Sequence, residues 1–222
     1  MIVQPLSKPT ALEIAKWRNV SRESLRTGWT TELQQEAFYE GNFKGNYKYW
    51  EFLTNVDQGG KSGVAVAAAG GFVNIDKKGG EIALIVHPLA RKQGFGTECV
   101  EWILQEGFAN LGYEKIWGEV YECGAVSFWQ KFIDKYGATD VKKDEAKYWN
   151  FRWHGSTIFS IDRGEYVKRW KERRILSDTN PRRDNRYNQS VSPDTRDGTR
   201  FSGGTRGRDS EDHGVEFDFT DT

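Results

Sequence analysis

The segment from Arg91 to Thr97, with the sequence Arg-Lys-Gln-Gly-Phe-Gly-Thr, constrains the fold of this chain more than any other. It follows an apolar, strand-like run over residues 82–86 and opens a helix-like segment over residues 94–110. Unpaired N–H groups and the dipole at a helix N-terminus attract an anion, and glycines let that anion approach the backbone closely. A Gly-x-Gly pair also marks ordinary turns. Because a strand precedes this pair, a helix follows it and Arg91 stands just ahead of it, the pattern predicts a phosphate-binding loop.

Composition excludes several classes of protein. The chain has 222 residues and a formal net charge of zero, so no overall charge attracts nucleic acid or an anionic membrane. Its two cysteines, Cys99 and Cys123, form no disulfide framework, and three histidines add too few ligands for a zinc site. The sequence shows no signal-like segment and no apolar run of membrane-spanning length. We expect a cytoplasmic protein with no metal and no membrane partner.

Residues 171–222 differ sharply from the rest of the chain. They hold many charged and small polar residues and few large apolar ones, so they bury too little surface to offset the entropy of ordering. We therefore predict a folded domain over residues 1–170 and a disordered charged tail over residues 171–222. Bases stand early in the tail and acids dominate its end, which leaves two interpretations: a solvated tail, or a tether for nucleic acid or a partner protein.

Within residues 1–170 the hydrophobic periodicity alternates between helix and strand. Capping boxes that begin at Thr10 and at Thr31 each predict the start of a helix. Further helices are expected over residues 94–110 and 125–135, and strands over residues 47–53, 63–75, 81–87, 115–121, 139–149 and 152–161. This order predicts an α/β fold with a mixed sheet: antiparallel hairpins first, one β-α-β unit in the middle and a hairpin at the end.

The order of these elements, with Arg-x-x-Gly-x-Gly between the central strand and its helix, resembles the GNAT acetyltransferase superfamily. The pattern is most similar to the ribosomal-protein-acetylating type and its phage relatives, through Trp-Arg-Asn at 17–19, Leu-Arg-Thr at 25–27 and Trp-Asn-Phe-Arg at 149–152. The resemblance implies a mixed, mostly antiparallel sheet that splays between its fourth and fifth strands, with helices on both faces. It implies an N-acetyltransferase but leaves the acceptor open, because this fold serves many acceptors.

The resemblance also implies acetyl-CoA as the co-substrate. Backbone amides of the loop would bind its pyrophosphate, namely those of Lys92, Gln93, Gly94, Phe95, Gly96 and Thr97. The side chains of Arg91 and Lys92 would add charge-assisted contacts to the phosphates. Where the two strands splay, the pantetheine arm would pair as an added strand would with the backbone of Ile85, Val86 and His87.

Acetylation of an amine needs a base for the amine, donors for the tetrahedral oxyanion and a proton for the leaving thiolate. Glu119 matches the position of a base glutamate in protein N-terminal acetyltransferases, Glu81 is the second candidate and Glu122 the third. The backbone N–H of about Val86 or His87 would meet the oxyanion. Transfer would be direct, with no covalent enzyme intermediate.

The proton donor is where the sequence departs from the family. A tyrosine is common one turn into the helix after the fifth strand, and Trp129 stands at that position. An indole N–H donates a hydrogen bond but gives up no proton at useful pH. Three accounts stay open: water or another hydroxyl gives the proton, the thiolate with its free-thiol pKa of about 8.5 leaves unassisted, or the domain binds CoA without catalysis. The other hydroxyls are those of Tyr121, Ser127 and Tyr136.

The acceptor is expected between the N-terminal segment and the closing hairpin. An aromatic and cationic set borders that region, namely Trp17, Arg18, Arg26, Trp29, Tyr148, Trp149, Trp153 and His154. The leading hypothesis for the acceptor is a primary amine on a protein N-terminus or on a similar small target. Two alternatives remain: a nucleic-acid-modifying acyltransferase of phage type, and a non-catalytic CoA-binding module. The chain is expected to be a monomer or a homodimer.

Overall fold

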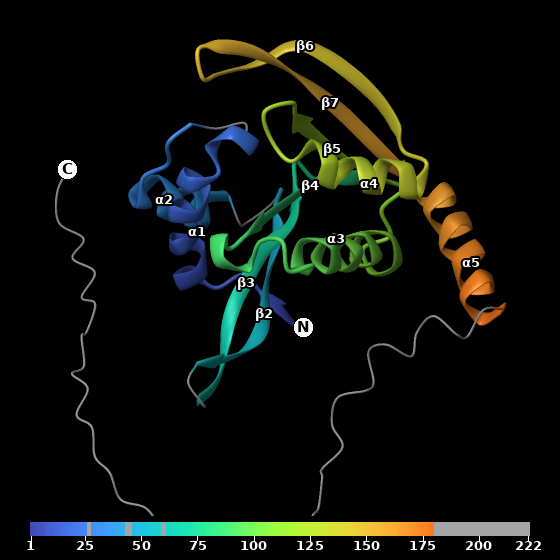
Figure 1. The fold of residues 1–222 in the computed structure, drawn as a ribbon, viewed down its shortest axis with the longest axis horizontal. Coiled ribbons are helices and arrows are strands. Elements are labelled where there is room, and N and C mark those ends of the chain that lie inside the picture. The colour runs from blue at the N-terminus through green and yellow to red at the C-terminus, as the bar shows by residue number, and fades with distance from the viewer. Residues whose placement is uncertain (26–27, 43–45, 59–60, 180–222) are drawn as a thin grey trace, which may run out of the picture. The chain divides into compact units, whose positions relative to one another are not determined.

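A seven-stranded sheet organises the domain, in the order β1-β2-β3-β4-β5-β7-β6 (Figure 1). The computed structural model describes residues 1–25, 28–42, 46–58 and 61–179 of the chain. The strands are β1 (Ile2–Pro5), β2 (Lys48–Gln58), β3 (Lys61–Val73), β4 (Gly79–Val86), β5 (Lys115–Tyr121), β6 (Thr139–Trp149) and β7 (Arg152–Asp162). Neighbouring strands are antiparallel except for β4 and β5, as the predicted β-α-β unit requires.

The parallel pair of β4 and β5 is short. It runs from Gly79 opposite Lys115 to Glu81 opposite Trp117, although both strands continue for several residues beyond that point. The two strands therefore diverge towards the ends of β4 and β5. The predicted fold class, a mixed and mostly antiparallel sheet that splays between the fourth and fifth strands, is confirmed.

Two helices begin at capping residues before β2. The first, α1 (Lys8–Val20), starts two residues before the predicted Thr10, because Ser7 is its cap and a proline occupies its first turn. The second, α2 (Glu32–Asn42), has the predicted capping box at Thr31, which accepts from the N–H of Gln34 and donates its own N–H to the Gln34 side chain. A single helical turn, η1 (Arg22–Ser24), lies between them.

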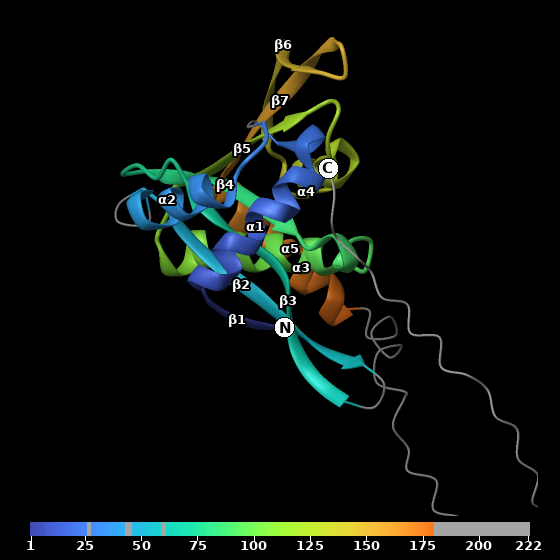
Figure 2. The same ribbon diagram turned by 90° about the vertical axis from the view of Figure 1, so that its left-hand side faces the viewer.

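The helices cover both faces of the sheet. Residues of α1 pack with Ala69 of β3 and Ile85 of β4 on one face. The other face carries the larger core, to which α3 (Phe95–Gln105) and α4 (Val126–Tyr136) contribute. Side chains alternate between faces along a strand, so odd-numbered residues of β4 share the α1 side with Ile85. By contrast, the hairpin of β6 and β7 projects away from the helices (Figure 2).

A fifth helix, α5 (Arg163–Thr179), closes the described chain. Its Tyr166 is buried against Phe108 and Tyr136, with ring centroids 4.7 and 5.1 Å away. Arg173 donates to the carbonyl of Lys135 over 2.9 Å. These contacts fix the helix to the core, so the predicted domain boundary at residue 170 falls inside a helix. Disorder was predicted for residues 171–222, but residues 171–179 belong to this helix, and residues 180–222 lie outside the described part of the chain.

Candidate active site

One backbone edge of β4 faces the splay, and part of it is already bonded, because the carbonyl of Val86 accepts from Arg91 Nε. The N–H of His87 donates to the carbonyl of Ala67 over 2.8 Å, so residues with odd numbers in β4 point their backbone groups at β3. Even-numbered residues therefore point theirs towards β5. Beyond the last paired residue, Glu81, the edge consists of Ile82, Leu84 and Val86.

The backbone of β5 faces the same opening. The N–H of Glu122 donates to the carbonyl of Gly155 over 3.0 Å, so even-numbered residues of β5 turn to β7. Glu119 and Tyr121 consequently point their backbone groups towards β4. The splay is thus bordered by two strand edges, and an extended ligand could add to either.

This geometry changes the predicted pantetheine contacts. Both backbone groups of His87 are engaged, because its carbonyl also accepts the N–H of Ala90 over 2.9 Å. Ile85 faces β3 by the same alternation. Of the three predicted residues, Val86 has the backbone that faces the splay, and Leu84 joins it. The period-two alternation of a strand was available from the sequence, but the strand edge that faces β5 was not.

The glycine loop joins β4 to α3, in the order of strand, loop and helix that the sequence predicts. After η2 (Pro88–Ala90), Lys92 and Gly94 both take positive φ values, 62° and 93°, and α3 begins at Phe95 with Gly94 as its cap. A Cβ on Gly94 would meet no heavy atom within 4 Å, so backbone conformation accounts for this glycine. A Cβ on Gly96 would lie 3.2 Å from Phe128 of α4, so close packing accounts for that one.

Arg91 is engaged within the protein. Its Nε donates to the carbonyl of Val86 over 3.3 Å, and its guanidinium also donates to Ser21 Oγ at the end of α1. Of the two side chains predicted to contact phosphates, Lys92 is the exposed one. Arg91 instead joins the loop to the N-terminal segment, a contact across 70 residues that no local pattern reveals.

Glu119 lies in a polar cluster just beyond the point where β4 and β5 separate. Its Oε1 accepts from Ser156 Oγ over 2.7 Å and lies 3.7 Å from Lys143 Nζ, while its Oε2 accepts from the Tyr121 hydroxyl over 3.4 Å. The Glu119 side chain is 12 % exposed. Sequence reasoning missed Ser156 and Lys143, because they reach this carboxylate through the register of β5, β7 and β6.

The other two glutamates occupy less favourable places. Glu81 is the last residue of β4 that pairs with β5, and its Oε2 accepts from Asn74 Nδ2 over 2.6 Å. Glu122 is exposed at the end of β5, where it accepts the N–H of Gly155 over 3.0 Å. Glu119 therefore remains the first of the three candidate bases, and the hydroxyl of Tyr121 lies beside it.

Two residues of α4 discussed as proton donors belong to the core. Trp129 packs in an aromatic cluster with Phe128, Phe132 and Phe159, with the last ring centroid 5.3 Å away. The hydroxyl of Tyr136 donates to Glu101 of α3, and burial raises the pKa of Tyr136. Neither side chain is directed to Glu119, whereas the hydroxyl of Tyr121 is.

The segment around η1 is fastened over this end of β5. Lys147 of β6 donates to the carbonyls of Arg22, Glu23 and Leu25, and burial lowers the pKa of Lys147. The Cys123 thiol donates to the carbonyl of Glu23 over 3.0 Å. These contacts place the segment next to Tyr121, whose ring lies 5.2 Å below the Lys147 ammonium group.

Four of the predicted acceptor residues form two groups. Trp149 and Trp29 flank the Arg22 guanidinium at 5.5 and 5.4 Å, beside η1. Tyr148 and Trp153 form an exposed pair across the hairpin. His154, in contrast, is buried and lies 3.2 Å from the carbonyl of Trp149, so it stabilises the hairpin. Arg26 lies outside the described residues.

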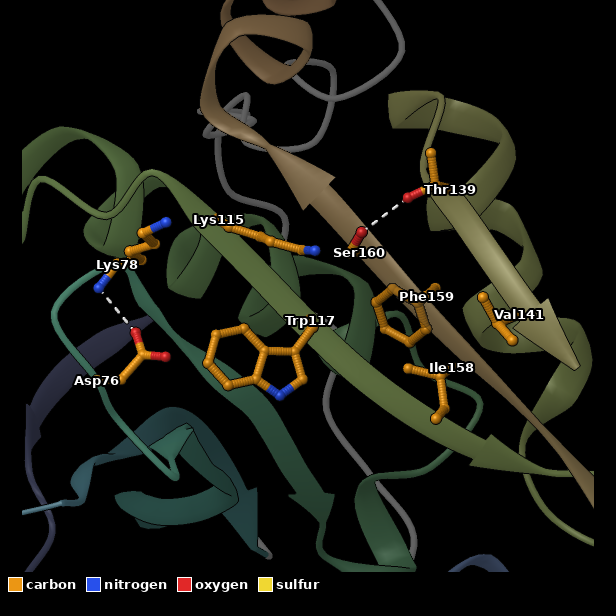
Figure 3. Close-up of a pocket in the computed structure, with 9 residues that line it drawn as sticks. All are labelled: Asp76, Lys78, Lys115, Trp117, Thr139, Val141, Ile158, Phe159 and Ser160. Atoms are coloured by element: carbon orange, nitrogen blue, oxygen red, sulfur yellow. Dashed lines mark hydrogen bonds between the residues drawn. The ribbon is translucent and has the colours of Figure 1, made fainter. Parts of the chain in front are cut away.

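Two hollows open on the α1 side of the sheet. One, of about 60 Å³, lies between α1, α2 and β4, where Arg18, Gln35 and Tyr49 supply its polar atoms. The other, of about 470 Å³, is a groove over β5, β7 and β6 (Figure 3). Among the described residues, no three His, Cys, Asp or Glu side chains are grouped as metal ligands would be. No helix in the described ranges is long and apolar enough to cross a membrane.

Comparison with known proteins agrees with this fold. Residues 14–133, more than half of the chain, match the family described as the acetyltransferase (GNAT) family. The spermidine/spermine N-acetyltransferase SpeG from Vibrio cholerae is similar in structure, with a TM-score of 0.60, 14% identity and coverage of 76% of this chain and 97% of that one. An N-acetyltransferase from Staphylococcus aureus has a TM-score of 0.58, 15% identity and coverage of 73% and 98%. No curated protein matches in sequence.

Proposed function

Because the chain belongs to the GNAT acetyltransferase family, we propose that it transfers an acetyl group from acetyl-CoA directly to a primary amine on a protein N-terminus or a similar small target. The ribosomal-protein-acetylating subgroup predicted from the sequence is part of this proposal. The main support for the proposed acetyl transfer is the position of Glu119. This carboxylate stands beyond the last paired residues of β4 and β5, beside the strand edges that face the splay.

The residues of the splay and the loop fit the co-substrate. The N-terminus of α3 and the open space around Gly94 suit a pyrophosphate, with Lys92 exposed beside it. The backbone edge at Leu84 and Val86 suits the amide groups of a pantetheine arm. Acetyl-CoA supplies the activated acyl group.

For each step of the acetyl transfer, this chain has a group that can perform it. Glu119 takes a proton from the acceptor ammonium, which frees the lone pair of the nitrogen to attack the thioester carbonyl. The N–H of Val86 donates to the oxyanion as the tetrahedral intermediate forms. When the C–S bond breaks, the thiolate gains a proton from the Tyr121 hydroxyl or from water, and the nitrogen, now part of the amide, gives its second proton back to the tyrosinate or hydroxide so formed. Ser156 holds the Glu119 carboxylate in place through its 2.7 Å hydrogen bond.

Release of CoA thiol tests the proposal. Purified protein is incubated with acetyl-CoA and with alaninamide, an N-terminal peptide or spermidine as acceptor. Glu119→Gln should lower kcat/KM by about 10²–10⁴, the usual contribution of a general base, while its melting temperature stays close to that of the wild type. Glu81→Gln is the matched control, since it removes a carboxylate from the same sheet face. If both variants keep full activity, the assignment of the base is wrong.

The non-catalytic alternative has one observation in its favour. Trp129, at the usual position of a tyrosine, is packed with Phe159 and offers no acidic hydroxyl. Tight binding of acetyl-CoA without turnover of any amine would support that alternative. The nucleic-acid alternative rests on the arginines of the tail. Arg173 is bonded to the core, whereas Arg182, Arg183 and Arg186 lie outside the described residues, so this alternative stays a prediction.

A further inference from the structure

The 470 Å³ groove lies on the face of the sheet from which the candidate base Glu119 projects. Every second residue of β5 projects from the same face of the sheet, and one such set consists of Lys115, Trp117 and Glu119. Ile158 of β7 lies opposite Glu119 in the strand register, Val141 of β6 lies opposite Ile158, and both line the groove. Figure 3 shows Trp117 on β5 and Ile158 on the neighbouring strand β7. The groove is therefore a continuation of the site around Glu119.

The floor of the groove is apolar and its far end is cationic. Trp117, Ile158 and Val141 form the floor, and Val141 is 64 % exposed. Lys78 and Lys115 stand at the end away from Glu119, and both side chains are exposed. Among the described residues, neither lysine takes part in an ion pair.

Asp76, the acidic residue that lines this end of the groove, is already bound, and Asp162, which lies opposite Lys115 in the register, is not among the lining residues. One carboxylate oxygen of Asp76 accepts the N–H of Lys78 over 2.7 Å and the N–H of Gly79 over 2.9 Å. These bonds hold the carboxylate against the turn between β3 and β4. The lysine ammonium groups are consequently the charges best placed to meet a ligand, and they complement an anionic group.

The dimensions fit an extended peptide. The four steps from Lys115 to Glu119 span about 13 Å at about 3.3 Å per residue of strand. An extended peptide has the same repeat, so its first, third and fifth residues would face the sheet at Glu119, Trp117 and Lys115. A volume of about 470 Å³ lies within the usual range for ligand sites, about 300–1,000 Å³.

We propose that the groove binds the N-terminal segment of an acceptor polypeptide, with an apolar third residue on Trp117 and an acidic fifth residue at Lys78 and Lys115. This inference rests on the proposed function and specifies its acceptor. The amine of the first residue lies at Glu119, the side chain of the third covers the apolar floor, and the carboxylate of the fifth meets two ammonium groups. A polyamine places a positive charge at that end and gains nothing there.

Steady-state kinetics with amidated pentapeptides test the proposal. The reference acceptor is Ala-Gly-Leu-Gly-Asp, compared with Ala-Gly-Leu-Gly-Lys, with Ala-Gly-Gly-Gly-Asp and with alaninamide, which is too short to reach the groove. The double variant Lys78→Glu and Lys115→Glu should lower kcat/KM for the aspartate peptide about tenfold and raise it for the lysine peptide, since each exposed ion pair is worth up to about fivefold. Trp117→Ala should remove the preference for leucine over glycine.

Two controls separate the groove from the chemistry. Lys142→Glu carries the same charge change on β6, but Lys142 neighbours Val141 and therefore projects from the opposite face of the sheet. It should leave all four acceptors unaffected. Alaninamide should be acetylated equally by the wild type and by every groove variant, which also shows that the variants are folded.

The outcomes distinguish the two proposals. If alaninamide is acetylated but the pentapeptides show no preference at the third and fifth residues, the groove inference is wrong and the proposed function stands. Faster turnover of spermidine than of every peptide also overturns the groove inference. If no amine is acetylated by the wild type, the proposed function itself fails.

Discussion

Replacing Gly94 with alanine should weaken acetyl-CoA binding well beyond its effect on stability. Gly94 caps α3 at a φ of 93°, and a Cβ there would meet no heavy atom within 4 Å. The substitution therefore creates no clash within the protein. Its cost in folding is that of a left-handed backbone, about 1–2 kcal/mol for a residue with a Cβ. In a domain of this size the melting temperature should fall by about 2–8 °C.

The effect on the ligand has a separate cause. The added methyl group stands where the pyrophosphate is expected to approach the amides of the loop, and it holds the phosphate oxygens away from them. We expect the Kd for acetyl-CoA to rise about tenfold, which corresponds to about 1.4 kcal/mol. Isothermal titration calorimetry measures this Kd, and circular dichroism follows the melting.

Gly112 supplies the matched control. It has a φ of 71°, a Cβ on it would also meet nothing within 4 Å, and it precedes the end of β5 that is paired with β4. Gly112→Ala should therefore lower the melting temperature by a similar amount and leave the Kd unchanged. Equal weakening by the two variants, or an unchanged Kd in Gly94→Ala, would refute the assignment of the loop.

Three further outcomes are expected. Lys147→Met should lower the free energy of unfolding by about 1.5–3 kcal/mol in urea titrations, because it removes the charged donor that holds three carbonyls of the η1 segment. Ellman's reagent at pH 8 should label Cys123 but not Cys99 in the folded protein, because Cys99 is buried and burial raises its pKa to about 12; labelling of both in the native state would contradict this. A chain that ends at residue 179 should melt as the full chain does. One that ends at residue 170 should melt about 4–8 °C lower, because it loses the contacts of Arg173, worth about 2 kcal/mol.

The local parts of this site could be predicted from the sequence. The strand of residues 82–86, the glycines of the loop and the capping box at Thr31 follow from side-chain periodicity and backbone preference, which act over a few residues. Those features also carried the resemblance to the family and thus the expected splay. Glu119 was predicted as the base through that resemblance, from its place in the strand over residues 115–121.

Tertiary structure decided which groups are available and what surrounds them. Register between distant strands brings Ser156 and Lys143 to Glu119, and packing of α5 on the core moves the domain boundary past residue 170. Arg91 is hydrogen-bonded to Ser21, and the N–H of His87 is hydrogen-bonded to the carbonyl of Ala67. The sequence alone therefore determined that a glycine loop follows a strand and opens a helix. Contacts between residues far apart in the chain decide which backbone edge, which cation and which carboxylate are available to a ligand beside that loop. These contacts are hydrogen bonds and packing, which act through space and carry no local sequence signal.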